Sequence, residues 1–221
     1  MGGPAYAIMR PLELNVRISS KIINPLRKKK EIIVVTGLPR SGTSMMMRML
    51  ESVGIEILTD HGRVADDDNP RGYYEYEMVK KLKDGCVSWL PLAQGKAIKV
   101  ISALITYLPS DYRYRILFMQ RSIPQVLASQ RKMLINRGED PDKVKDSEMA
   151  STFDKHLTQV MDWLSNQQNI STLYIDYNKV INEPAPNIRY INSFLGGFLD
   201  EERMIAVVEP DLYRQRNYKI K

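Results

Sequence analysis

The sequence predicts an α/β fold of three layers, in which a parallel sheet of the phosphate-loop (P-loop) type carries helices on both faces. Two observations lead to this prediction. A run of β-branched residues at positions 31–36 is followed directly by a loop with a glycine at each end and then by a helical pattern. Further apolar runs of strand length alternate with helical segments along the chain, which is typical of parallel sheets.

The first strand, at residues 31–36, is expected to be buried because its apolar run is almost uninterrupted. The helix after it has one apolar face, and Gly54 is placed to end it. That face consists of Met45, Met46, Met49, Leu50 and Val53. Three more strands are expected at residues 97–101, 115–120 and 172–176.

Two longer helices complete the predicted order. Ser122 and Gln125 stand at the positions of a capping box, and Gly138 is the expected stop of that helix. The longest helix is expected at 144–166, where Met149, Phe153, Leu157, Val160 and Leu164 form an apolar stripe. Ligands of such sheets bind beyond the carboxyl ends of the strands, where residues 37–44 lie.

Charge divides the chain into a basic N-terminal extension at residues 1–30 and a P-loop domain at residues 31–221. The whole chain has 221 residues and a formal net charge of +6. The extension holds seven basic residues against Glu13 alone, and the remaining chain is balanced. The hydrophobic share of 43% is ordinary for a globular protein, so a sizeable core is expected.

Cys86 is the only cysteine, so no disulfide can form within the chain, and a reducing compartment is acceptable. No apolar run is long enough for a transmembrane segment. We therefore expect a cytoplasmic protein. The expected partner is a small-molecule or carbohydrate-like substrate; no nucleic acid is expected, and a homo-oligomer is compatible with the sequence.

The loop at residues 37–44, Gly-Leu-Pro-Arg-Ser-Gly-Thr-Ser, has the two-glycine spacing of a phosphate loop. Thr43 stands where an ATP-binding loop has its lysine. Backbone N–H groups at the helix start, the helix dipole and the side chains of Arg40, Ser41, Thr43 and Ser44 are expected to converge on an anion. The loop therefore predicts phosphate binding and argues against ordinary Walker-type ATP hydrolysis.

Residues 34–50 resemble the 5′-phosphosulfate loop of sulfotransferases that use 3′-phosphoadenosine 5′-phosphosulfate (PAPS). The Pro-Arg-Ser-Gly-Thr-Ser form is similar to the bacterial and carbohydrate branches of that family. The resemblance implies that Pro39, Arg40, Ser41, Gly42, Thr43 and Ser44 hold the phosphosulfate of PAPS, with adenosine 3′,5′-bisphosphate (PAP) as the product.

A second segment, from Arg115 through Arg121 to Ser129, resembles the 3′-phosphate site of the same family. An arginine there ends a strand, and a serine eight residues later lies on the following helix. With Pro124 near the helix start, Arg121 and Ser129 are placed to grip one phosphate from two sides. The resemblance also implies an aromatic role near adenine for Tyr177 and a nucleotide contact for Arg214, whereas Met45 replaces the tryptophan of cytosolic members.

The resemblance implies a sulfuryl transfer that needs no metal ion, and the two histidines and single cysteine show no metal-ligand spacing. Lys99, on a strand that otherwise looks buried, resembles the lysine that the family aims at the transferring group, and Arg40 is expected to assist it. For the base that takes the acceptor proton we rank Glu75 first, with Glu77 and His61 behind it.

Two alternatives stay open at the level of sequence. A P-loop kinase acting on a small hydroxyl compound is supported by Asp176, which ends an apolar strand as a magnesium-holding aspartate does. The missing loop lysine is the main objection to it. The other alternative is a non-catalytic nucleotide-binding module, which would bind the bisphosphate and transfer nothing.

Overall fold

The computed structural model describes residues 30–60, 62 and 72–208. Its parallel sheet has four strands in the order β2-β1-β3-β4. The strands are β1 (Ile32–Gly37), β2 (Ala97–Lys99), β3 (Tyr114–Gln120) and β4 (Ile170–Asp176). In the register of the sheet, Val35 of β1 lies between Lys99 of β2 and Leu117 of β3. The β1 run is central and almost fully buried, as its composition predicts.

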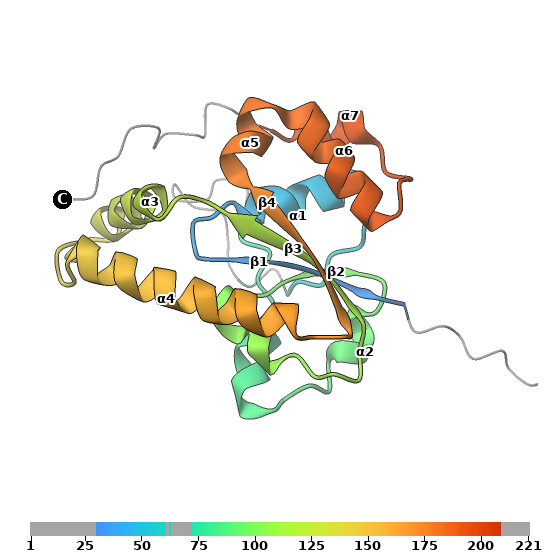
Figure 1. The fold of residues 1–221 in the computed structure, drawn as a ribbon, viewed down its shortest axis with the longest axis horizontal. Coiled ribbons are helices and arrows are strands. Elements are labelled where there is room, and N and C mark those ends of the chain that lie inside the picture. Colours follow the sequence, from blue (N-terminus) through green and yellow to red (C-terminus); the bar gives the residue numbers. More distant parts are fainter. Residues whose placement is uncertain (1–29, 61, 63–71, 209–221) are drawn as a thin grey trace, which may run out of the picture.

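One face of the sheet is covered by α1 (Thr43–Ser52), α5 (Tyr177–Asn182), α6 (Pro184–Leu195) and α7 (Glu201–Ala206), as Figure 1 shows. The core on this side joins the methionines of α1 to apolar side chains of α5 and α6, such as Val180 and Ile188. Met47 is fully buried together with Met46 and Met49. The helix is therefore enclosed on more sides than the single apolar face that the sequence predicts.

The opposite face is covered by the 3₁₀ helices η1 (Glu77–Asp84) and η2 (Ser102–Tyr107), by α2 (Leu90–Ala93) and by α4 (Asp146–Ser165). The core there joins Ile116 and Phe118 of β3 to Trp89, Val160 and Leu164. Helices on both faces of a parallel sheet confirm the three-layer α/β prediction.

Helix α3 (Ile123–Asn136) follows β3 beyond the carboxyl end of the sheet and packs against α4. The predicted capping box at its start is wrong. Ser122 makes no side-chain cap, and the Gln125 carboxamide instead accepts a hydrogen bond from Arg121 Nε at 3.3 Å. The helix ends at Asn136, and Gly138 follows in a left-handed conformation, close to the expected stop.

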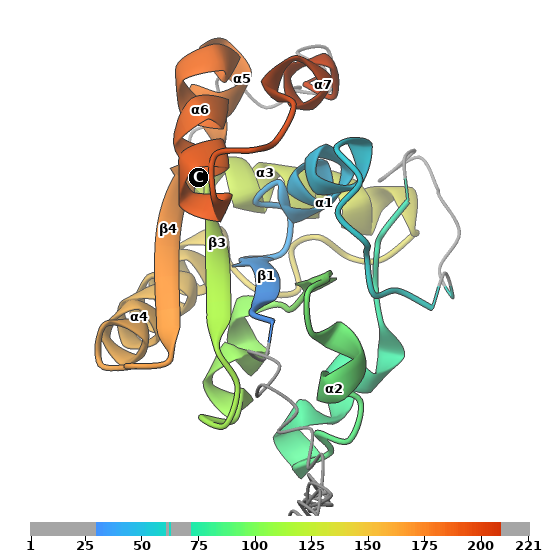
Figure 2. The ribbon, with the colours of Figure 1, turned by 90° about the vertical axis from the view of Figure 1, so that its right-hand side faces the viewer.

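The carboxyl ends of β1, β3 and β4 all lead toward the level of α1 and α3 (Figure 2). The loop between β1 and α1 lies at this edge, with Lys99 at the end of the neighbouring strand. Among the described residues, no helix is long and apolar enough to cross a membrane.

Candidate active site

The turn from β1 to α1 needs a glycine at both ends. A Cβ on Gly37 would lie 2.5 Å from Met119 O and 2.5 Å from Ser41 Oγ, and a Cβ on Gly42 would lie 2.4 Å from the Tyr177 ring. Gly42 is the N-cap of α1 and has a φ of 101°, which favours glycine. The turn therefore brings backbone very close to two neighbouring elements.

The residues at the start of α1 fit a bound anion. Backbone N–H groups of the first helical turn have no partners within the helix, and the helix dipole adds partial positive charge there. Ser41 is 1% exposed, and its Oγ has no hydrogen-bond partner among the described residues. Thr43 is also buried. Since a buried hydroxyl without a partner is costly, Ser41 suits a site that a ligand oxygen completes.

Lys99 reaches this helix start from the adjacent strand. Its Nζ donates to Tyr73 O at 2.8 Å and to Ser44 Oγ at 3.3 Å, and it lies 5.9 Å from the centroid of the Tyr73 ring. The structure thus places the lysine beside the loop and in contact with Tyr73.

Arg121 lies at the carboxyl end of β3, and contacts with a side chain, a backbone oxygen and an aromatic ring fix its guanidinium. Besides the contact with Gln125, its Nη1 donates to Arg40 O at 3.0 Å. Its Cζ lies 4.6 Å from the centroid of the Tyr177 ring, a cation–π contact. Tyr177, the aromatic residue expected near adenine, thus lies close to both Arg121 and Gly42.

Ser129, on α3, is brought to the same place as the loop. Arg40 Nε donates to Ser129 Oγ at 3.0 Å, across 89 residues of sequence. Arg40 has a φ of 70°, in the left-handed region that residues with a Cβ rarely adopt. The structure therefore brings Arg40, Arg121 and Ser129 together at one end of the loop, while Lys99 and Ser44 lie together at the start of α1.

The acidic residues ranked as bases lie on the segment that leads from Tyr73 to η1. The backbone oxygen of Glu75 accepts from Thr59 Oγ1 at 2.8 Å and from the backbone N–H of Asp60 at 3.3 Å. Glu77 forms an exposed ion pair with Lys80 at 2.8 Å. This hydrogen bond raises the pKa of Lys80, and Glu75 contributes at longer range.

Tyr74 has a φ of 54°, so the backbone turns sharply just before Glu75. Its hydroxyl donates to Glu51 of α1. Burial first, and then this hydrogen bond, raise the pKa of Tyr74 well above its ordinary value. A bulky residue in the left-handed region is an energetic cost that recurs at functional sites.

Several expected residues lie outside the described part of the chain. These are His61, one of the candidate bases, Arg214, expected to contact the nucleotide, and most of the N-terminal extension. Within the described ranges, no group of three or more His, Cys, Asp or Glu side chains is arranged to hold a metal ion.

Sequence reasoning missed the contact of Tyr73 with Lys99, the contact of Gln125 with Arg121 and the buried hydroxyl of Thr36. The Thr36 Oγ1 is fully buried at the end of β1 and has no hydrogen-bond partner among the described residues. A polar residue inside an otherwise apolar strand is the signal that draws attention to it. The capping pattern assigns Gln125 to a cap because it does not reveal that Arg121 donates to the Gln125 carboxamide.

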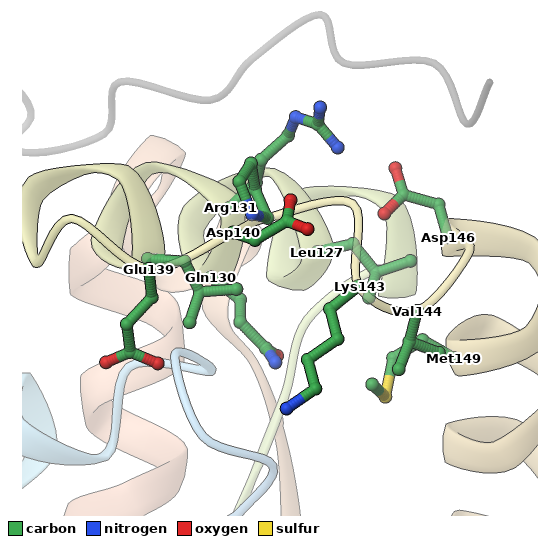
Figure 3. Close-up of a pocket in the computed structure, with 11 residues that line it drawn as sticks. Leu127, Gln130, Arg131, Glu139, Asp140, Lys143, Val144, Asp146 and Met149 are labelled. Carbon is green, nitrogen blue, oxygen red and sulfur yellow. The ribbon is translucent and has the colours of Figure 1, made fainter.

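A cavity of about 150 Å³ lies between α3, α4 and the loop that joins them (Figure 3). Acidic and basic side chains line it together with Leu127 and Met149. Arg131, at its rim, is paired with Asp142 at 2.7 Å. None of the candidate site residues lines this cavity, so it is separate from the loop site.

Comparison with known proteins identifies the family of the chain. The model of a protein family described as "Sulfotransferase domain" matches residues 30–213. No curated protein is similar enough in sequence to count as a relative.

Among solved structures, the sulfotransferase domain from the curacin biosynthetic pathway has 13% identity and a TM-score of 0.50, covering 81% of this chain and 78% of that one. Mouse sulfotransferase SULT7A1 complexed with PAP has 14% identity and a TM-score of 0.49, covering 91% and 76%. Retinol dehydratase in complex with androsterone and inactive cofactor PAP has 16% identity and a TM-score of 0.48, covering 82% and 64%. At this identity, the first likeness shows the fold alone.

Proposed function

Because the chain belongs to the sulfotransferase domain family, we propose that it transfers a sulfuryl group from PAPS to a hydroxyl or amine of a small or carbohydrate-like acceptor. The family match favours this function over the kinase and over the non-catalytic module. PAPS supplies the activated sulfuryl group. The observation that carries the proposal is the convergence of the loop with Lys99 at one end and with Arg121 and Ser129 at the other.

The loop residues 39–44 are proposed to hold the 5′-phosphosulfate. Support comes from the buried Ser41 and Thr43, from the helix start and from the fit of a ligand oxygen to the Ser41 hydroxyl. Arg121 and Ser129 are proposed to hold the 3′-phosphate, since a guanidinium and a hydroxyl suit a phosphate group from two sides. Tyr177, beside both, is proposed to face the adenosine.

Lys99 is proposed to stabilise the charge that develops on the leaving phosphate. Its Nζ lies 3.3 Å from Ser44 Oγ, beside the loop. A cation that is already held in place where negative charge develops stabilises the transition state without any rearrangement of the protein. The acceptor oxygen forms a bond to sulfur while the bond from sulfur to the phosphate oxygen breaks. Glu75 is proposed to take the acceptor proton, with Glu77 and His61 as the alternatives.

Three finer assignments belong to the same proposal. The Pro-Arg-Ser-Gly-Thr-Ser sequence of the loop supports the bacterial and carbohydrate branches of the family. Membership of the sulfotransferase domain family supports a donor site that works without magnesium. A cytoplasmic location is compatible with the single Cys86, which forms no disulfide within the chain.

The test is transfer of label from ³⁵S-labelled PAPS to a panel of sugars, phenols, aliphatic alcohols and amines, in the presence of EDTA. We expect one acceptor class to be labelled, and Thr43→Ala to lose transfer without loss of the fold. Transfer of the γ-phosphate of ATP in a parallel assay without EDTA, with an absolute magnesium requirement and with no transfer from PAPS, would establish a kinase instead. Binding of PAP without transfer to any acceptor would favour the non-catalytic module.

A further inference from the structure

We propose that residues 12–19 of the N-terminal extension pair as an antiparallel strand with the open edge of β4 in the same molecule, and so extend the sheet by one strand. Residues 12–19 lie outside the described part of the chain. The pairing is independent of the proposed reaction, because it involves the edge of the sheet and not the loop after β1.

The outer edge of β4 has no strand beside it among the described residues. β4 is the last strand in the order β2-β1-β3-β4, and Figure 2 shows it at the left of the sheet. The other outer edge, at β2, is covered, because Leu58 N–H donates to Ala97 O and Ala97 N–H donates to Glu56 O, both at 2.8 Å. β4 is therefore the edge at which another strand can add.

The backbone of β4 offers hydrogen bonds to such a strand. Tyr114 N–H of β3 donates to Asn169 O at 3.0 Å, and alternate residues of a strand bond to the same neighbour. The N–H groups of Thr172 and Tyr174 therefore point away from β3, and within the described ranges no group accepts from them. β4 also lacks the Lys and Pro residues that protect many edge strands, so this edge is prone to pairing.

An apolar strip lies beside this edge. Asn192 of α6 donates to Glu201 Oε1 of α7 at 2.9 Å, and α7 packs against α1, on the β1 and β2 side of the sheet. Tyr190 and Phe194 each lie about 160° around α6 from Asn192 and so face the β4 side. With the half-buried Leu173 of β4 they form the edge strip, in which Tyr190 is 71% exposed.

The sequence of residues 12–19 has the pattern of a strand with one apolar face. Apolar and polar residues alternate strictly: Leu12, Leu14, Val16 and Ile18 with Glu13, Asn15, Arg17 and Ser19. In a strand this alternation places the four apolar side chains on one face. That face covers the edge strip, while the polar side chains remain in water. The segment covers the edge of a domain whose hydrophobic clusters are complete without it.

The length and direction of the chain fit an antiparallel strand from the same molecule. Two strand spacings separate β1 from β4, so a strand added beyond β4 lies about 14 Å from β1. Residues 20–30 span up to about 36 Å when extended. An antiparallel strand brings residue 19 to the amino end of β4, which is the side of the sheet where β1 begins at Ile32. A parallel strand would require the connection to run back along the whole of β4.

Hydrogen–deuterium exchange of backbone amides in the full chain tests this pairing, and light scattering measures the mass. The variant Val16→Asp places a charge on the apolar face of the segment. Asn15→Asp is the matched control, because it adds the same charge at the neighbouring position, on the polar face. A cooperative thermal transition shows that each variant is folded.

We expect the amides of residues 12–19, and those of Thr172 and Tyr174, to exchange at least about tenfold more slowly in the wild type than in Val16→Asp. Asn15→Asp should exchange as the wild type does. All three proteins should have the mass of a single chain.

Equal exchange at β4 in the three proteins would overturn this inference. Slow exchange at β4 in a protein with a dimeric mass would also overturn it, because the edge would then pair with a second copy. Slow exchange of Thr172 and Tyr174 together with fast exchange of residues 12–19 would show that another segment covers the edge.

Discussion

At the scale of single residues, Lys99 contacts both the start of α1 and the segment that carries Glu75, the first candidate for the base. Its Nζ contacts Ser44 on one side and the Tyr73 carbonyl oxygen on the other. Glu75 follows Tyr73 by two residues, across the left-handed turn at Tyr74. This short path from the lysine to a carboxylate is the reason to keep Glu75 as the first candidate for the base.

The first prediction is that Glu75→Gln lowers turnover by about 10² to 10⁴ while the affinity for PAP stays unchanged. A positioned carboxylate typically contributes a factor of this size by taking a proton during the reaction. Glutamine keeps the shape of the side chain and removes its basicity. Steady-state rates with ³⁵S-labelled PAPS and calorimetry with PAP measure the two effects separately.

Glu77→Gln is the control, because its carboxylate is exposed and paired with Lys80. It should leave turnover close to the wild-type value. Full activity of Glu75→Gln, together with a large loss in Glu77→Gln or His61→Ala, would transfer the role of the base to the residue that fails.

At the scale of elements, the β1–α1 turn depends on the contact between Gly42 and the Tyr177 ring. That contact joins the loop to the start of α5, and Arg121 stacks on the same ring. The geometry of the turn and the placement of the arginine are therefore coupled.

We expect Gly42→Ala to destabilise the protein by more than about 2 kcal/mol and to weaken PAP binding, because a Cβ there adds a clash with Tyr177 to an unfavourable φ. Gly54→Ala is the matched control. Gly54 has a φ of 83°, and a Cβ there meets no atom within 4 Å. It should lose only about 1 to 2 kcal/mol, the cost of the left-handed conformation, and keep its PAP affinity. Chemical denaturation and calorimetry measure both, and equal effects of the two substitutions would refute the role of the Tyr177 contact.

A second prediction at this scale concerns the contact between η2 and α4. His156 Nε2 lies 2.9 Å from the Oγ of Ser102, which is 1% exposed. Burial lowers the pKa of His156, so the folded protein resists protonation that the unfolded chain accepts near pH 6.5. Protonation of the unfolded chain therefore lowers the free energy of unfolding as the pH falls below about 6.5, whereas above that pH His156 is neutral in both states and the full stability is present.

Thermal unfolding between pH 7.5 and 5.5 tests this prediction. The wild-type midpoint should fall on acidification, and His156→Gln should show a smaller fall over the same interval. Parallel curves for the two proteins would show that the titration of His156 does not affect folding.

Periodicity and glycine positions in the sequence predict the β1 strand, the loop and the end of α1. They do not predict which of several polar groups a side chain bonds to. The strand at residues 31–36, the loop and the stop near Gly54 follow from local pattern. The Ser122–Gln125 pattern misleads because Arg121, in the link between β3 and α3, donates to the Gln125 carboxamide. The Arg40–Ser129 contact spans 89 residues, and nothing local in the sequence indicates it.

At the scale of the whole molecule, the core of the described chain is built from the sheet and its two helical layers. Both hydrophobic clusters use residues from Ile32 onward, and the family match begins at residue 30. The length and alternation of the strands predict this architecture. They do not predict which helix covers which face, because that depends on packing between segments far apart in sequence.

We therefore expect a chain that lacks residues 1–28 to unfold cooperatively and to bind PAP as the full chain does. Circular dichroism during denaturation and calorimetry of PAP measure these two properties. Insolubility or loss of PAP binding would show that the basic extension contributes to the domain or to its assembly.

The central claim is that the loop and α3 together bind a nucleotide with phosphates at both ends. Calorimetry with Arg121→Ala tests it most directly, with PAP and with adenosine 5′-phosphate (AMP), which lacks the 3′-phosphate, as ligands. Arg121 contacts the loop at the Arg40 carbonyl, so AMP binding should weaken slightly. PAP binding should weaken at least about tenfold more, because charge-assisted hydrogen bonds to the 3′-phosphate are lost as well. Equal weakening of the two ligands would contradict the proposed donor site.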